Sequence, residues 1–202
     1  METLVHGILL AAGESRRMGF PKPLLTIGSE TWLAHLVATL LAAVPRLTIV
    51  LGAHAERVRA AVPVDQRIAV VENPDFTRGQ LSSLKVGLAA VPSAAGAVMV
   101  HLVDHPMVSA ATFAGVVAVY QQARQPIVIA RYGGRRGHPV IFDRSIFAEL
   151  LAAPEALGAH AVVQADPARV AYFDGPDSGI VADLDTPADV VHAGLVAPPQ
   201  ER

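Results

Sequence analysis

Short runs of Val, Ile, Leu and Ala recur along the chain, without the alternation of apolar and polar residues that marks a half-exposed strand. These runs occupy residues 5–12, 47–51, 68–71, 97–103 and 127–130. Continuous apolar runs of this length are typical of strands that are covered on both faces. This feature therefore predicts a buried sheet with helices on either side.

Helical patterns separate the apolar runs. Over residues 33–44, apolar side chains recur at the i, i+3, i+4, i+7 spacing of one helix face. Two more helices are predicted over 81–90 and 110–125. The capping and terminating residues expected for the three helices are, in chain order, Ser29 and Pro45, then Pro92, then Ser109 and Pro126. The order strand, helix, strand, helix predicts an α/β fold with a mostly parallel sheet.

Glycines interrupt this rhythm after residue 131. Gly133, Gly134 and Gly137 lie in a basic turn before the strand-like run 139–142, which predicts an antiparallel excursion. The elements expected after this turn are helices at 145–153 and 157–165, followed by strands at 170–173 and 180–184.

The last helix has a clear start signal. Thr186, Pro187 and Asp189 are expected as its N-cap, its first residue and its capping-box partner. The tail 198–202 is expected to fray. Because no repeat, low-complexity block or linker is visible, residues 1–197 are expected to form a single domain.

Composition excludes several classes of function. The formal net charge is -2, so no global positive field exists, and neither nucleic acid nor a membrane is expected as a partner. The chain has no Cys, which excludes disulfides and thiolate chemistry and favours the reducing cytoplasm. The mean hydropathy is +0.41, but the first apolar run is too short to span a bilayer and precedes its charges. Neither a signal peptide nor a transmembrane helix is expected.

The first apolar run leads directly into a glycine-rich cationic loop. Gly13 and Gly19 permit a tight turn whose backbone N–H groups can face an anion. Arg16, Arg17 and Lys22 add positive charge to the same stretch. The loop has neither the Gly-Lys-Ser/Thr sequence of a Walker A motif nor the glycine spacing of a dinucleotide fingerprint. Because ligands of α/β sheets bind at the carboxyl ends of strands, we expect a phosphate cradle rather than a solvated basic turn.

Other polar residues stand at the expected ends of elements. Gln80, Ser82 and Ser83 lie at the start of a predicted helix, where they can hold a phosphate or a base edge, or act only as helix caps. His138 follows two arginines in a glycine-rich turn. A lone histidine is more often structural, but this placement makes His138 a candidate ligand contact. His101 lies inside an apolar run and is expected in the core.

Three carboxylates are candidate metal ligands. Asp104 follows the run 97–103, and Asp183 and Asp185 precede the last helix. Mg²⁺ prefers hard oxygen ligands, usually one or two carboxylates together with substrate phosphates. Asp104 with Asp185 or Asp183 would supply them, whereas all three residues can also be explained as ordinary caps of turns and helices.

The stretch 10–22 carries a specific motif, Leu-Ala-Ala-Gly-x-Ser-x-Arg-Met-Gly-x-x-Lys. It resembles the nucleotide-binding loop of nucleoside-triphosphate transferases, and the chain is most similar among them to the molybdenum-cofactor nucleotidyltransferases, particularly the cytidylyl branch. Matching stretches are Asn-Pro-Asp at 73–75, Gly-Gln-Leu-Ser-Ser-Leu at 79–84, Val-Asp-His-Pro at 103–106, Arg-Gly-His-Pro-Val at 136–140 and Leu-Asp-Thr-Pro-Ala-Asp at 184–189. Together the matches span nearly the whole chain.

The resemblance implies a three-layer α/β/α Rossmann-like fold with a mostly parallel mixed sheet, and Mg²⁺-dependent transfer of a nucleotidyl group to a phosphate with release of pyrophosphate. The implied site residues are Arg17, Lys22 and Asp104 for catalysis, Asp104 with Asp185 favoured over Asp183 for the metal, and His105 and His138 for the acceptor. Those implied for the nucleotide are Leu10, Ala11, Ala12, Gly13, Ser15, Arg16, Arg17, Met18, Gly19, Lys22, Gln80, Ser82 and Ser83.

The leading hypothesis is transfer of CMP from CTP to the phosphate of molybdopterin, with or without bound molybdenum. The resemblance implies a recipient molybdoenzyme or its chaperone as a further partner. Alternatives are guanylyl transfer, transfer to another small phosphate such as a sugar phosphate, and a carrier that binds without chemistry.

Two local features bear on the substrates. Relatives that use guanine tend to read Leu-Ala-Gly-Gly after the first strand, and those that use pyrimidines Leu-Ala-Ala-Gly, so the methyl group of Ala12 favours CTP. Residues 155–161 depart from the Gly-Asp-x-Gly-Ala-Arg stretch of the cytidylyl branch. That departure concerns the acceptor more than the nucleotide.

Overall fold

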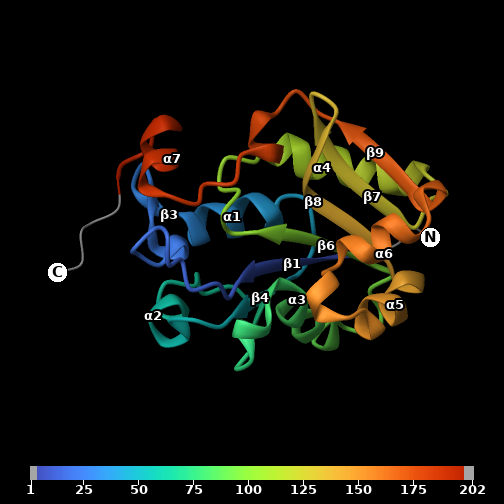
Figure 1. The fold of residues 1–202 in the computed structure, drawn as a ribbon, viewed down its shortest axis with the longest axis horizontal. Helices are drawn as coiled ribbons and strands as arrows, with labels where there is room; N and C mark the ends of the chain where they lie inside the picture. Colours follow the sequence, from blue (N-terminus) through green and yellow to red (C-terminus); the bar gives the residue numbers. More distant parts are fainter. Residues whose placement is uncertain (1–3, 198–202) are drawn as a thin grey trace.

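A seven-stranded sheet forms the centre of the protein in the computed structural model, which describes residues 4–197 (Figure 1). Its strand order is β5-β4-β1-β6-β8-β7-β9. The strands are β1 (Val5–Ala11), β4 (Leu47–Leu51), β5 (Ile68–Glu72), β6 (Ala97–Leu102), β7 (Ile127–Tyr132), β8 (Arg135–Asp143) and β9 (Val170–Asp174). The tail expected to fray, 198–202, lies outside the described residues.

Most neighbouring strands of this sheet are parallel. β1 pairs in parallel with β4 and β6, β4 with β5, and β7 with β9, whereas β8 runs antiparallel to both β6 and β7. The predicted excursion after residue 131 is thus the β7–β8 hairpin. The predicted α/β fold with a mostly parallel mixed sheet is confirmed.

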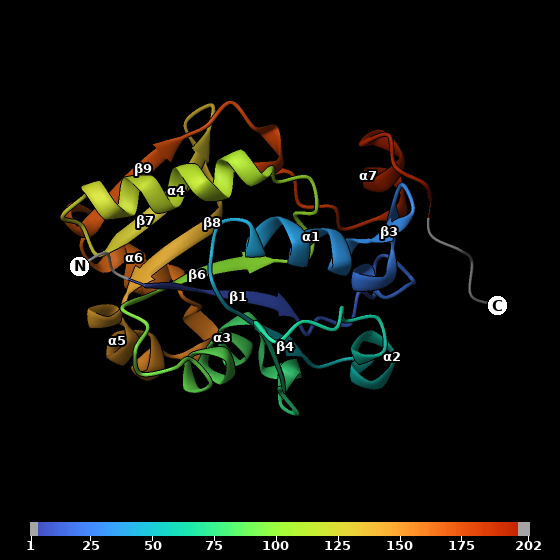
Figure 2. The same ribbon diagram turned by 180° about the vertical axis from the view of Figure 1, so that it is seen from behind.

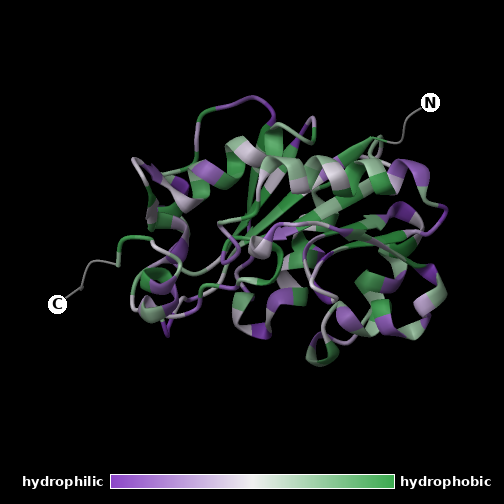
Figure 3. Ribbon diagram, turned by 90° about the horizontal axis from the view of Figure 1, so that it is seen from above, coloured by the Kyte–Doolittle hydropathy of each residue, from purple (hydrophilic) through white to green (hydrophobic). Residues whose placement is uncertain are grey.

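Helices cover both faces of the sheet (Figure 2). One face packs against α1 (Trp32–Leu41) and α4 (Ala110–Gln122). The other packs against α3 (Gln80–Ala89), α5 (Phe147–Ala152) and α6 (His160–Ala165). Figure 3 shows hydrophobic residues concentrated along the strands of this middle layer. Within the described residues, no helix is long and apolar enough to cross a membrane.

The strand β1 explains why the first apolar run lacks polar alternation. Leu9 and Ala11 belong to the core beneath α1 and α4, while Ile8 and Leu10 belong to the core beneath α3 and α5. Successive side chains of a strand point to opposite faces, and here both faces are buried. Every residue of β1 is accordingly buried.

Local signals placed some element ends wrongly. Ser29 does not cap α1, because it lies in the turn of a small hairpin of β2 (Thr26–Ile27) and β3 (Glu30–Thr31). The cap is Thr31, whose side chain accepts a hydrogen bond from the backbone N–H of Ala34 at 3.1 Å. The short helix α2 (Ala55–Arg59) was not predicted.

The predicted strand 180–184 was also wrong. Ser178–Val181 is a 3-10 turn in which the Asp177 side chain accepts from the backbone N–H of Gly179. Its apolar residue Ile180 is buried in the core without strand pairing. An apolar run that is buried by loop packing looks like a strand in the sequence, and tertiary contacts decide which it becomes.

The capping signal of the last helix is confirmed. In α7 (Pro187–His192), Thr186 and Asp189 form a reciprocal capping box. A third apolar cluster joins this helix to the loop after β1, and its buried members are Met18, Leu25, Trp32, Leu184 and Val190. Figure 1 shows α7 beside β3, on the side of the molecule toward which β1 runs. The end of the chain therefore supports the cationic loop near its beginning.

Candidate active site

A cleft of about 380 Å³ opens at the carboxyl ends of β1 and β6. The loop 12–17 after β1 forms one side, and Asp104, two residues after the end of β6, forms part of the other. Asp185 reaches the same cleft from the segment before α7. The two adjacent parallel strands thus bring together groups that are far apart in the sequence, as expected at this edge of an α/β sheet.

Lys22 lies between the two carboxylates of the cleft. Its Nζ atom is 2.6 Å from Oδ1 of Asp185 and 3.6 Å from Oδ2 of Asp104, and the residue is only 7% exposed. The Arg17 guanidinium is 2.7 Å from Oδ2 of Asp185. The hydrogen bond from Lys22, helped by the charges of Lys22 and Arg17, lowers the pKa of Asp185. Asp185 is therefore anionic at neutral pH, between two cations.

The backbone of the loop holds Lys22 in place. Ser15 has a positive φ of 54°, and its carbonyl accepts hydrogen bonds from the backbone N–H groups of Met18 and Gly19. The Ser15 hydroxyl accepts from the backbone N–H of Lys22 at 3.1 Å. A non-glycine residue with positive φ is uncommon and is maintained only by its surroundings. Ser15 is thus the residue that folds the loop back onto Lys22.

The two carboxylates fit a divalent cation. The buried Oδ1 atom of Asp104 has no hydrogen-bond partner among the described residues, whereas both oxygens of Asp185 are engaged by Lys22 and Arg17. No set of three or more His, Asp or Glu side chains in residues 4–197 is arranged to hold a metal. A cation here would take one or two carboxylates and complete its shell with substrate oxygens and water, which is the usual manner of Mg²⁺.

A second cavity, of about 560 Å³, adjoins the first. Leu10, Gln80 and Leu102 line both. Apolar side chains from α3, β7 and β8 form much of the second cavity, and the polar residues that line it are Gln80, His105, Arg135, Arg136, His138, His160, Gln164 and Asp183. A cavity of this kind suits a ligand with a flat or apolar body and a few polar groups.

Three histidines cluster beside the second cavity. The ring centroids of His105 and His138 are 5.3 Å apart, and that of His101 lies 6.2 Å and 6.3 Å from them. Burial, and next the charge of His105, lowers the pKa of His138 to about 3. Burial, and next the two neighbouring histidines, lowers the pKa of His101 well below its ordinary value. His101 is fully buried, as predicted.

The free energy of unfolding is expected to fall when the pH is lowered from 7 to 5. His138 has a pKa near 6.5 in the unfolded chain and about 3 in the folded protein, so the unfolded state binds more protons over this interval. The resulting loss is about 2 kcal/mol. Urea denaturation at both pH values measures it.

The variant His138→Gln should show a smaller loss between pH 7 and 5 than the wild type, because its side chain does not titrate. The matched control is His192→Gln on the exposed surface of α7, which should keep the full pH dependence. An equal pH dependence in wild type and His138→Gln would contradict the prediction.

The family is decided by a comparison with known protein families. The family of the MobA-like NTP transferase domain matches residues 7–170, which is most of the chain. The chain belongs to this family. The resemblance expected from the motif at 10–22 is confirmed, and membership of the MobA-like family makes the protein a nucleotidyltransferase.

Some relatives of this MobA-like protein match it over nearly their whole length, and others over only part of their length. It is 24% identical to the molybdenum cofactor cytidylyltransferase of Escherichia coli K12, over 92% of this chain and 93% of that protein. It is 31% identical to the bifunctional protein GlmU of Mycobacterium avium, over 60% of this chain. This match spans only about a quarter (26%) of GlmU.

Solved structures support the fold of this MobA-like protein. Rv0371c from Mycobacterium tuberculosis H37Rv superposes with a TM-score of 0.77 at 32% identity, covering 95% of this chain and 97% of that one. The same protein has been solved in complex with manganese, with a TM-score of 0.73 at 31% identity, covering 95% and 98%.

Most of the residues predicted for the nucleotide and metal line the first cleft of the MobA-like domain. They are Leu10, Ala12, Gly13, Ser15, Arg16, Arg17, Lys22, Gln80, Ser83, Asp104 and Asp185. His105, His138 and Asp183 line the second cavity instead. Asp183 is thus separated from the Lys22 group that Asp104 and Asp185 share.

Four predicted nucleotide contacts do not line the cleft. Ala11 is buried in the first core, Met18 is buried under α7, and Gly19 lies outside the lining. The Ser82 hydroxyl accepts from the Asn73 side-chain amide at 2.9 Å and donates to the Gly79 carbonyl at 2.7 Å. Among these four, Met18 has a structural contact in the third apolar cluster, and Ser82 has structural hydrogen bonds to Asn73 and Gly79.

Several lining residues were missed by the sequence argument. Phe76, Thr77 and Gly79 line the first cleft, and Arg135, Arg136, His160 and Gln164 line the second cavity. Phe76 to Gly79 follow β5, so the rule that ligands bind after parallel strands was the available signal. No local signal placed β8 and α6 around one cavity, because their pairing is tertiary.

A strap formed by residues 177–185 carries two of the predicted carboxylates. The Asp177 carboxylate accepts from the backbone N–H of Ser109 and the hydroxyl of Thr112, each at 2.8 Å. At the other end, the backbone N–H of Leu184 donates to the Asp104 carbonyl at 2.8 Å. The strap is therefore fastened at both ends to the segment that follows β6, and it delivers Asp185 to Lys22.

Proposed function

We propose that the protein transfers CMP from CTP to the phosphate of molybdopterin and releases pyrophosphate. The observation that carries this proposal is the grouping of Lys22, Arg17, Asp104 and Asp185 at the mouth of a larger, partly apolar cavity. The two cations and two carboxylates of this group would bind a triphosphate and its metal ion, and the adjoining cavity has room for the body of a second substrate. The likeness to the cytidylyltransferase over nearly the full length of both chains supports the same choice.

In the proposed reaction, an oxygen of the acceptor phosphate attacks the α-phosphorus of CTP. The new P–O bond forms as the bond between the α-phosphorus and its bridging oxygen to the β-phosphate breaks, so pyrophosphate leaves with that electron pair. Arg17 and Lys22 would stabilise the charge that develops on the phosphates. Neither a covalent intermediate nor a protein nucleophile is needed, because positioning and electrostatics carry most of the rate in such transfers.

A divalent cation, which we propose to be Mg²⁺, would be held by Asp104 and Asp185. When bound, such an ion neutralises phosphate charge and orients the phosphate oxygens. The unpartnered oxygen of Asp104 supports this assignment, and so does the manganese complex of the relative from Mycobacterium tuberculosis. His105 and His138 are proposed as contacts of the acceptor.

The test is a pyrophosphate-release assay with each of the four common nucleoside triphosphates, with and without molybdopterin. We expect release with CTP only when molybdopterin and Mg²⁺ are both present. Release with a sugar phosphate as the acceptor, and none with molybdopterin, would favour the alternative of nucleotidyl transfer to another small phosphate. Binding of nucleotide or pterin without any release would indicate a carrier.

The wild-type enzyme is expected to prefer CTP over GTP. Ala12 lines the first cleft directly after β1. In this proposal its methyl group reduces the room for a two-ring base. One methyl group gives discrimination of only about 1–3 kcal/mol, so contacts to the base edge must supply the rest. The measurement is kcat/KM for both nucleotides in wild type and in Ala12→Gly, in which the preference should shrink.

A wild-type preference for GTP would overturn the assignment of the base. A CTP preference that Ala12→Gly leaves unchanged would overturn only its steric explanation.

A further inference from the structure

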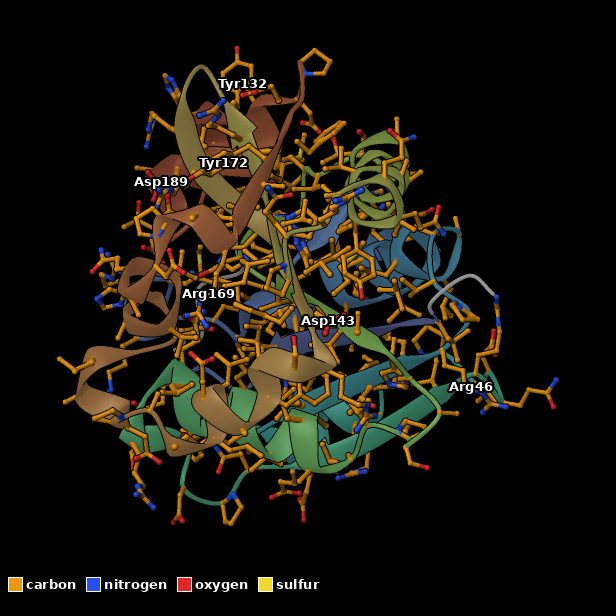
Figure 4. The ribbon with its side chains drawn as sticks, turned by 90° about the vertical axis from the view of Figure 1, so that its right-hand side faces the viewer. Arg46, Tyr132, Asp143, Arg169, Tyr172 and Asp189 are labelled. Carbon is orange, nitrogen blue, oxygen red and sulfur yellow. The ribbon has the colours of Figure 1, made fainter. Side chains whose placement is uncertain are left out.

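The aromatic ring of Tyr172 on β9 contacts two arginines. The guanidinium carbon of Arg131 is 4.5 Å from the ring centroid, and that of Arg136 is 5.3 Å from it. Figure 4 shows Tyr172 near the β7–β8 hairpin, below Tyr132 at the outer end of that hairpin. Arg131 and Arg136 face each other across the hairpin, on β7 and β8.

The two arginines differ in what else they contact. Arg131 forms a two-pronged ion pair with Asp174, at 2.6 Å and 2.7 Å, and does not line the second cavity. Arg136 lines that cavity and donates a hydrogen bond to the Tyr172 hydroxyl. Among the described residues, Arg136 has no carboxylate partner. Its position is thus set by an aromatic ring and a neutral hydroxyl, which leaves its charge and its other N–H groups for a ligand.

The placement of Arg136 decides which part of a ligand it meets. The β8 strand is the neighbour of β6, which leads into Asp104, and lies two strands from β1, which leads into the Lys22 loop. In the proposed reaction the acceptor phosphate reacts in the first cleft, and the rest of the acceptor would extend into the adjoining second cavity, which β8 helps to line. A guanidinium is a planar fork of donors, and it can bind the adjacent oxygen and nitrogen acceptors on the edge of a flat heterocycle as it does at the O6/N7 edge of guanine.

We propose that Arg136 is a specificity residue for the acceptor substrate, because it binds the hydrogen-bond-accepting edge of a planar heterocycle in that substrate. Tyr172 is then a positioning residue that holds Arg136 in place. The proposal rests on the proposed function in taking the second cavity as the acceptor site. Tyr172 does not line this cavity and acts only through Arg136. Apolar residues such as Leu84 and Ile129 would cover the face of the heterocycle.

The test measures binding and turnover separately. Molybdopterin is titrated into wild type, Arg136→Gln, Tyr172→Phe and the double variant, with its pterin fluorescence as the signal, and KM and kcat are measured where pyrophosphate is released. We expect the Kd of molybdopterin to rise about tenfold in Arg136→Gln, as for the loss of a charged hydrogen bond, and by a smaller factor in Tyr172→Phe. The KM for the nucleotide should stay unchanged.

Two comparisons separate a specific contact from a general effect. The double variant should bind no more weakly than Arg136→Gln, because Tyr172 acts through Arg136. The matched control is Arg131→Gln, which removes the same charge from beside the same ring at a residue that does not line the second cavity, and it should bind molybdopterin like the wild type. Equal weakening in Arg131→Gln, a raised nucleotide KM, or an unchanged Kd in Arg136→Gln would overturn the proposal.

The results that would disprove the proposed function differ from those that would disprove the role of Arg136. Wild type that binds molybdopterin without releasing pyrophosphate would defeat that function, while the Kd series would still support Arg136 as a specificity residue. Wild type that does not bind molybdopterin would overturn the heterocycle assignment, even if pyrophosphate were released with a sugar phosphate.

Discussion

The Asp104→Asn variant is expected to fold like the wild type and to lose about 10²- to 10³-fold in turnover, the range seen when one preorganised charge contact to a transition state is removed. The substitution keeps the shape of the side chain but removes the carboxylate whose buried Oδ1 atom has no partner in the described residues. The 2.6 Å pair between Lys22 and Asp185 does not depend on Asp104 and should persist. The measurement is pyrophosphate release against Mg²⁺ concentration.

Asp65→Asn is the control for this prediction. Asp65 is paired with Arg67 at 2.7 Å, lies outside both cavities and should tolerate the same change without loss of turnover. Urea denaturation of both variants shows whether the fold is intact. Near-wild-type turnover of Asp104→Asn at limiting Mg²⁺ would show that Asp104 is not a metal ligand.

The sequence allowed the sheet to be predicted because each buried strand carries its own signal. The run 47–51 became β4 with the same bounds, since both faces of that strand are covered and no polar residue has to face water. The capping box at Thr186 was equally readable, because both partners lie within four residues. By contrast, Ser29 and Thr31 are both plausible caps, and only the β2–β3 hairpin decides between them.

The candidate site was predictable where a loop follows a strand directly. Gly13 to Lys22 and Asp104 follow β1 and β6, and the parallel order of these strands brings them to one edge. Arg136 could not be assigned in this way, because its position depends on Tyr172, which is 36 residues away on β9. Such a contact exists only once β7, β8 and β9 have paired, and no local pattern records it.

The Gly137→Ala variant is expected to lose about 1–3 kcal/mol of unfolding free energy, as for overpacking of a tight site. It is also expected to lose about 100-fold in turnover, as when a group of the active site is displaced by about 1 Å. A methyl group on Gly137 would lie 1.8 Å from the Ile180 carbonyl oxygen and 2.6 Å from its carbon, so the strap 177–185 has to move. The strap places Asp185 against Lys22 and Arg17. Turnover and urea denaturation are measured together at a temperature at which the variant is folded.

Gly7→Ala is the matched control, because its methyl group would crowd only the ends of the Leu47 and Val44 side chains, at 2.8 Å and 3.0 Å, while the nearest backbone atom is at an ordinary contact distance of 3.5 Å. The Gly7→Ala variant should keep its turnover even if its free energy of unfolding falls.

A second variant, Asp177→Asn, weakens the hydrogen bonds that fasten the strap without adding volume, and it should lower turnover about tenfold. If Gly137→Ala and Asp177→Asn are destabilised but turn over normally, the strap does not position Asp185 for the reaction. Because Lys22 is buried and its nearest anion is Asp185, normal turnover would also mean that this pair is a structural contact rather than part of the phosphate site.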